Sequence, residues 1–104
     1  MNNAIRKKLG EKIRQWRKLR ELTQEQLGEK AGISYKFIGE VERGTVNPSL
    51  DSLIGISQAL DVNVKELFPR ENDLVTEFSH EELKTIKKAV KLLNSRLNVK
   101  HAKV

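Results

Sequence analysis

Hydrogen-bonding side chains gather on one side of the segment between residues 34 and 44. Ile38 and Val41 lie three residues apart and predict the buried stripe of a short helix, so the other side chains point outward. The outward residues are Tyr35, Lys36, Gly39, Glu40 and Arg43. In the major groove of DNA, lysine donates to guanine, tyrosine donates or packs on a thymine methyl, and glutamate accepts from cytosine. We therefore expect base-edge contacts from Tyr35, Lys36 and Glu40. For Glu40, a solvated position or an i,i+4 pair with Lys36 is the alternative.

The residues before this segment predict a second helix and a tight turn that position it. Thr23 can cap a helix, and Gln26 can reach back to the Thr23 N–H, which makes a capping box. Gly32 follows Ala31 where a helix stops in a left-handed residue, and Ser34 caps the next helix. Two helices around a glycine turn are the helix-turn-helix plan, whose second helix enters the major groove with its N-terminal end first.

The order and spacing of these motifs resemble the Cro/CI-type helix-turn-helix of phage repressors and of the bacterial XRE family. The motifs are Thr23-Gln24-Glu25-Gln26-Leu27, Ala31-Gly32-Ile33-Ser34, Ile38, Val41-Glu42-Arg43-Gly44 and Asn47-Pro48-Ser49. The resemblance runs from about Leu9 to Phe68. It implies a DNA-binding transcriptional regulator, a repressor, that binds double-stranded DNA as a homodimer at a palindromic operator. The alternative is a protein-interaction module or antitoxin-type partner with the same fold.

The resemblance also implies roles for individual residues. Base contacts fall at Tyr35, Lys36 and Glu40, although the glutamines common in phage repressors are missing here, which leaves the operator sequence open. Contacts to the DNA backbone are implied for Gln24, Ser34, Phe37, Arg43, Thr45 and Asn47. Ser34 is also an N-cap, Gln24 can instead be a plain exposed side chain, and Phe37 can instead pack within the domain. Arg17 and Glu42 are implied to form a partly buried ion pair that locks the first helix to the recognition helix.

The apolar pattern predicts an all-α domain of five helices over residues 5–69, which the resemblance identifies as lambda-repressor-like. A basic helix covers residues 5–21, and its charged face is solvated or meets phosphates. After the two motif helices, Pro48 and Ser49 start a fourth helix, and a short turn ends at Phe68. Gly55 within the fourth helix suggests close packing there. The expected core is Trp16, Leu27, Ile38, Val41, Leu53, Leu60 and Phe68.

A C-terminal amphipathic helix is predicted after this domain. Residues 70–78 form a linker, residues 79–98 the helix, and residues 99–104 a flexible tail. Ser79 and Glu82 predict its capping box. Its apolar seam repeats at steps of three and four residues and comprises Leu83, Ile86, Val90, Leu93 and Leu97. We expect this seam to form a homodimer interface, and the alternative is that the helix folds back on its own domain.

Composition narrows the function further. The chain has 104 residues, a net charge of +6 and no cysteine, which suits a polyanionic partner and excludes disulfides and thiol chemistry. The two histidines do not stand in a metal-ligand spacing, and no glycine-rich phosphate loop is present. We expect no enzyme activity, no metal and no cofactor. Without an apolar run of membrane length or a signal peptide, a cytoplasmic location is expected, and a protein co-regulator is a further possible partner.

Overall fold

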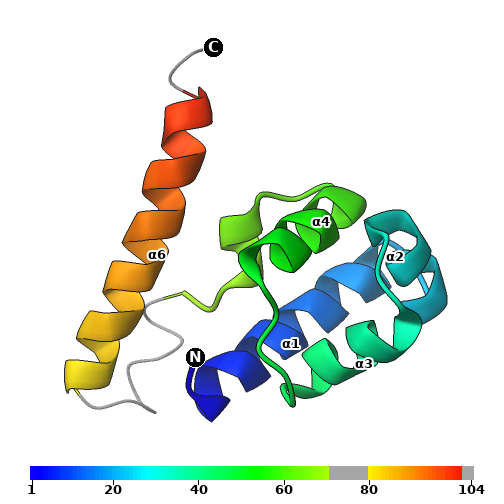
Figure 1. Cartoon of the computed structure of the whole chain (residues 1–104), viewed down its shortest axis with the longest axis horizontal. Helices are drawn as coiled ribbons and strands as arrows, with labels where there is room; N and C mark the ends of the chain where they lie inside the picture. The colour runs from blue at the N-terminus through cyan, green and yellow to red at the C-terminus, as the bar shows by residue number, and fades with distance from the viewer. Residues whose placement is uncertain (71–79, 102–104) are drawn as a thin grey trace. The chain divides into compact units, whose positions relative to one another are not determined.

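The computed structural model describes residues 1–70 and 80–101, with side chains described as far as residue 95 (Figure 1). The chain divides into two compact units, Met1–Phe68 and Pro69–Val104, and each is described by itself. All described elements are helical, so the all-α prediction is confirmed. The predicted cap at Ser79 and the side chain of Leu97 lie outside the described residues.

The first helix, α1, spans Asn3–Leu19 and carries the buried residues Leu9, Gly10 and Ile13. The Asn2 side chain caps it by accepting from the Ile5 N–H at 2.9 Å. The helix ends at Leu19, close to the predicted end near residue 21. Glu21 adopts a left-handed conformation with φ 57°, which turns the chain toward the next helix.

The two motif helices occupy the predicted positions. Helix α2 spans Gln24–Ala31 and begins with the Thr23 capping box, whose two hydrogen bonds measure 2.8 and 3.0 Å. Gly32 ends it with φ 69°. Helix α3 spans Tyr35–Arg43 and begins at Ser34, whose Oγ accepts from the Phe37 N–H at 3.1 Å. The helix-turn-helix prediction is therefore confirmed.

Two further elements complete the first unit. Helix α4 spans Leu50–Leu60 and is capped by Ser49, whose Oγ accepts from the Ser52 N–H at 3.0 Å. A short 3₁₀ helix, η1, spans Val64–Leu67. The Trp16 indole Nε1–H donates to the Glu66 carbonyl oxygen at 3.2 Å and joins α1 to η1. This hydrogen bond fixes the polar edge of the only tryptophan in the chain.

The core lies between α1, α2, α3, α4 and η1. The buried apolar residues of the first unit are Leu9, Ile13, Leu27, Ile38, Val41, Leu53, Ile56, Leu60, Val64 and Leu67. Trp16 and Phe68, which we expected in the core, are only half-buried. Trp16 stays at the edge because its indole N–H needs the polar partner that it finds on η1.

Glycines allow close approaches of the backbone within this unit. A Cβ built on Gly10 would lie 2.4 Å from the carbonyl oxygens of both Val41 and Glu42, so α1 and α3 cross almost in backbone contact. A Cβ on Gly28 would lie 2.4 Å from the Ile33 carbonyl oxygen, so this glycine makes room for the turn between α2 and α3. Gly55 is less crowded, since its nearest neighbour, the Ala31 carbonyl oxygen, would lie 3.4 Å away.

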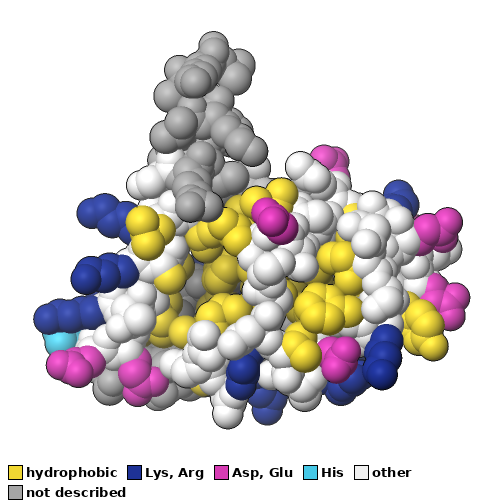
Figure 2. Space-filling model, viewed as in Figure 1, with side chains coloured by type: hydrophobic (Ala, Val, Ile, Leu, Met, Phe, Trp, Pro, Cys, Tyr) yellow, Lys and Arg dark blue, Asp and Glu magenta, His cyan; other side chains and the backbone are white. Residues whose placement is uncertain are grey.

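The second unit contains α6, which spans His80–His101. The helix includes residues 99–101, which extend past the predicted helix end at residue 98. Neither glycine nor proline occurs between residues 80 and 101, and nothing local stops the helix earlier. Lys84, Lys87, Lys88 and Lys91 are exposed on it. Figure 2 shows the Lys and Arg side chains of the described residues in dark blue. Among the described helices, none is both long enough and apolar enough to cross a membrane.

Candidate nucleic-acid interface

The outward face of α3 presents the residues expected to read bases. Tyr35 is 60% exposed at the N-terminal end of the helix, and Lys36 beside it is exposed too. Glu40 lies one turn further along and is half-buried. Within the described part of the chain, Lys36 and Glu40 form no ion pair, so the intrahelical alternative for Glu40 is absent from this structure. The three side chains expected to contact bases thus lie on one short helix, with Tyr35 and Lys36 exposed and Glu40 half-buried.

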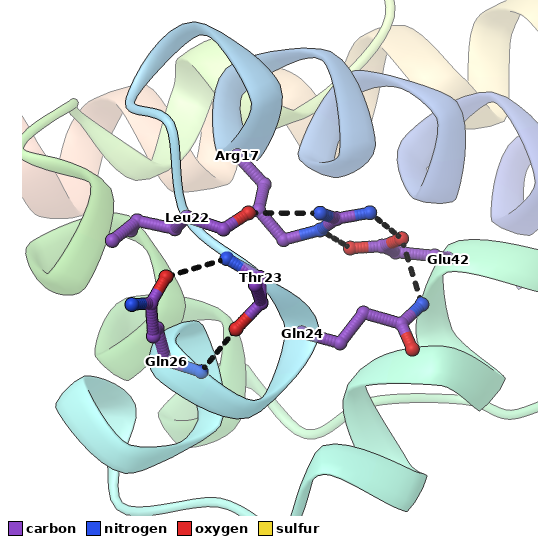
Figure 3. A network of polar contacts seen from close by, with 6 residues as sticks. All are labelled: Arg17, Leu22, Thr23, Gln24, Gln26 and Glu42. Atoms are coloured by element: carbon purple, nitrogen blue, oxygen red, sulfur yellow. Dashed lines mark hydrogen bonds and ion pairs between the residues drawn. The ribbon is translucent and has the colours of Figure 1, made fainter.

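A buried polar network holds α3 against α1 and α2 (Figure 3). Arg17 and Glu42 form a two-pronged ion pair, with Nε to Oε2 at 2.7 Å and Nη2 to Oε1 at 3.0 Å. The third guanidinium nitrogen, Nη1, donates to the Leu22 carbonyl oxygen at 2.9 Å. The Gln24 amide Nε2–H donates to Glu42 Oε1 at 3.1 Å. The network therefore links the end of α1, the start of α2 and the last turn of α3.

The ion pair is nearly sealed from solvent. The side chains of Arg17 and Glu42 are 11% and 3% exposed. The hydrogen bond to Glu42 raises the pKa of Arg17, with the charge of the carboxylate adding to the effect and burial opposing it. Arg17 is accordingly a structural residue that orients α3, as the resemblance implied.

Gln24 belongs both to this network and to the expected DNA surface. One of its two amide hydrogens points at Glu42, which leaves the other available for a DNA phosphate. The residue stands at the first position of α2, where the backbone N–H has no partner inside the helix. It also borders an open depression of about 560 Å³ that is lined by Arg17, Leu22, Thr23, Gln24, Glu25 and Tyr35.

Ser34 caps α3 as expected, whereas the DNA-backbone contacts of Ser34 and Phe37 stay predictions. The Ser34 hydroxyl oxygen accepts the cap hydrogen bond, so its hydrogen remains available as a donor. Phe37 is half-buried.

The segment after α3 is held by contacts that the sequence did not reveal. The Thr45 N–H and hydroxyl both donate to the Glu40 carbonyl oxygen, each at 3.1 Å. Thr45 thus closes the C-terminal end of α3, and a phosphate contact from its hydroxyl would compete with that role. Asn47 Oδ1 accepts from Arg6 Nη1 at 3.3 Å, and Arg6 Nη2 donates to Asn3 Oδ1. Because arginine only donates, it turns the Asn47 amide so that the NH₂ group is left for other acceptors.

Arg6 and Gly10 make contacts to the segment around α3 that the sequence analysis missed. The density of basic residues in α1 indicated that some of them lie near the interface, but it did not single out Arg6. Gly10 carried no local signal, because the backbone that it accommodates is more than 30 residues away in the sequence.

Comparison with known proteins places this geometry in a family. The family model for the helix-turn-helix matches residues 13–67. The immunity repressor protein of Bacillus phage phi105 is 34% identical over 92 residues, which cover 86% of this chain but only 64% of the repressor.

Two solved structures extend the comparison. The restriction-modification controller protein C.AhdI from Aeromonas hydrophila is 36% identical with a TM-score of 0.60, covering 61% of this chain and 96% of C.AhdI. A structure of a SinR protein–SinI protein complex contains a chain that is 26% identical with a TM-score of 0.59, covering 91% of this chain and 96% of that one.

Proposed function

This chain belongs to the XRE-type helix-turn-helix family of DNA-binding transcriptional regulators, which are not enzymes, and we propose that it represses transcription from a palindromic operator. The observation that carries the proposal is the pairing of an exposed polar face on α3 with a buried network behind it. Recognition needs side chains that reach the groove from a helix whose position does not vary. The proposed place of action is the cytoplasm.

Sequence would be read from the N-terminal half of α3. Lys36 would donate to guanine, and Tyr35 would donate through its hydroxyl or pack on a thymine methyl. Glu40, one turn along, would accept from a cytosine amino group. The exposure of Tyr35 and Lys36 supports this assignment, because neither side chain has to leave a packed position to enter the groove.

Backbone contacts would surround this reading face. They would come from Gln24, Ser34, Phe37, Arg43, Thr45 and Asn47. The donors left over on Gln24, Ser34 and Asn47 support such contacts. For Thr45 the hydrogen bonds to Glu40 favour an indirect contribution, through the shape of the loop.

Dimerisation would double the interface. We propose that the seam of Leu83, Ile86, Val90, Leu93 and Leu97 pairs two copies of α6. Two recognition helices related by a two-fold axis would then meet half-sites whose centres lie roughly 10 base pairs or a multiple apart. Folding of α6 back onto its own domain is the alternative, and it would leave the dimer contact to α4 or η1.

The test is selection of bound sequences from a random duplex library, with the wild-type chain and with Tyr35→Ala and Lys36→Ala. Each base-reading side chain should contribute about 1–3 kcal/mol, so the preferred base should change at the contacted position. The matched control is Lys65→Ala, which removes an exposed lysine from η1 and should leave the preferred site unchanged. A Lys36→Ala chain that selects the wild-type site with wild-type affinity would disprove the base-reading role.

A second candidate function is binding of a protein partner. The observation that favours it is the similarity over 91% of this chain to a chain in the SinR–SinI complex. Retention on random duplex separates the two functions. A DNA-binding chain should lose affinity with a log–log slope of about −0.9 per phosphate contact as salt rises. A chain that is not retained at low salt, although it is folded, would favour the protein partner.

A further inference from the structure

Gly39 differs from the other crowded glycines of the first unit. A Cβ on Gly10, Gly28 or Gly44 would lie within 2.8 Å of backbone atoms, so the fold itself requires these glycines. A Cβ on Gly39 would meet only the ends of two side chains, with Arg43 Nη1 at 3.1 Å and the Gln24 amide atoms at 3.5 and 3.7 Å. Its φ is not positive, so the backbone conformation does not demand glycine either.

Glycine at this position nevertheless lowers the stability of α3. Glycine in the middle of a helix destabilises the helix relative to alanine, and Gly39 is the fifth of nine residues. Nevertheless it is buried, because the Gln24 and Arg43 side chains lie across it. Because Gly39 has no side chain, the ends of these two side chains lie close above the α3 backbone.

The two side chains reach Gly39 from different helices, and both bring hydrogen-bond donors. Gln24 comes from the start of α2, and its amide is held by Glu42, whose charge is already matched by Arg17. Arg43 comes from the last turn of α3 and is exposed. Within the part of the chain whose side chains are described, its guanidinium has no hydrogen-bond or ion-pair partner. A fixed amide N–H beside a free guanidinium is suited to the oxygens of a phosphodiester.

We propose that Gly39 forms the floor of a phosphate-binding notch in which Gln24 and Arg43 clamp the same DNA phosphate. The inference rests on the proposed DNA binding. It adds that two contacts to the DNA backbone, made by side chains from different helices, share one phosphate. In this arrangement α2 and α3 are tied to the DNA at a single point. An added methyl group would push the two donors apart and leave the fold intact.

The first experiment compares Gly39→Ala with Gly55→Ala. Both replace a helical glycine, and the Gly55 control has only an ordinary contact above it. Both variants should keep or raise the melting temperature. Gly39→Ala should weaken binding to operator and to random duplex alike by roughly tenfold, the size of one lost charged hydrogen bond, whereas Gly55→Ala should bind as the wild type does. Wild-type affinity in Gly39→Ala would overturn the proposal.

The second experiment measures the sharing directly. Gln24→Ala, Arg43→Ala and the double variant are compared by their affinity for random duplex in a double-mutant cycle. If both residues clamp one phosphate, the double variant should lose less affinity than the sum of the two single losses, because each residue holds the phosphate less well without the other. Losses that add in full would overturn the shared site, even if Gly39→Ala did not fold.

A third comparison identifies how the methyl group acts. Placing Gly39→Ala in the Gln24→Ala/Arg43→Ala background should cause no further loss of affinity, because the displaced side chains are already gone. A loss as large as in the wild-type background would mean that the methyl group meets DNA directly, and it would overturn the clamp. Failure of the wild-type chain to bind any duplex would count against the proposed function instead.

Discussion

Replacement of Arg17 by methionine should be among the most destabilising single changes in the first unit. The Glu42 carboxylate is 3% exposed and receives three side-chain hydrogen bonds, two of them from Arg17. Without Arg17 a buried charge would be left with one neutral amide donor. Breaking a buried pair in this way costs about 3–5 kcal/mol.

The size of this loss can be compared with the total stability. At about 0.05–0.15 kcal/mol per residue, a unit of this length has roughly 3–10 kcal/mol of unfolding free energy. Each kcal/mol lost lowers the melting temperature of so small a domain by about 4–8 °C. Arg17→Met should therefore lower the melting temperature by at least about 12 °C and leave much of the chain unfolded near 37 °C.

Tryptophan fluorescence during urea unfolding gives the measurement. Trp16 is the only tryptophan in the chain and joins α1 to η1, so its signal reports the first unit. Arg14→Met is the matched control, since Arg14 is exposed on the same helix. The double variant Arg17→Met/Glu42→Leu should recover most of the loss, because no charge is stranded. If Arg17→Met costs no more than Arg14→Met, the reasoning about the buried charge fails.

The same pair predicts how the effect depends on pH. The pKa of Arg17 is raised in the folded chain, mainly by its hydrogen bond to Glu42. The contribution of this ion pair to the unfolding free energy is then fully present below the unfolded-state pKa of Arg17. It is lost only as pH rises through the still higher folded-state pKa. The cost of Arg17→Met should accordingly be the same at about pH 6 and about pH 9, and a cost that falls over this range would contradict the direction of the shift.

Three further outcomes follow from particular contacts. Gly10→Ala should lower the unfolding free energy of the first unit by about 1–3 kcal/mol in urea unfolding, because its Cβ would lie 2.4 Å from backbone oxygens of α3. Stability equal to that of Gly55→Ala would refute the close crossing of α1 and α3. Thr45→Val should cost about 0.5–1.5 kcal/mol, since it removes the hydroxyl bond to Glu40. Its affinity for random duplex should stay at the wild-type value, and a loss of affinity shared by all sequences would show a direct phosphate contact instead. Val90→Asp/Leu93→Asp should turn a dimer into a monomer in light scattering while the Trp16 signal is kept, and a variant that stays dimeric would exclude the α6 seam.

Local signals explain why the helix bounds could be predicted. Thr23, Ser34 and Ser49 each supply a side-chain oxygen to a free N–H in the first turn that follows. Gly32 and Gly44 adopt the left-handed conformation that ends α2 and α3. These caps and turns involve residues only three or four positions apart, so they can be predicted from the sequence alone.

The missed features depend on segments that are distant in the sequence. Arg6 meets Asn47 across 41 positions, and Gly10 meets the carbonyl oxygens of residues 41 and 42. No periodicity in the sequence indicates such contacts, because they depend on how α1 packs across α3. The Arg17–Glu42 pair is also distant, and it was anticipated only through resemblance to a family. Residue 39 was predicted to point outward, but in the structure it is buried beside the side chains of Gln24 and Arg43.

The arrangement separates the residues that hold α3 from those expected to read DNA. Tyr35 and Lys36 are exposed and lie outside the buried network, so their substitution should change stability by no more than about 0.5 kcal/mol. Gln24 is different, because its amide touches both Glu42 and the notch above Gly39. A change at Gln24 therefore disturbs the network and the proposed phosphate contact together. The choice of base can then vary through the two exposed residues, while anchoring to the DNA backbone remains tied to the fold.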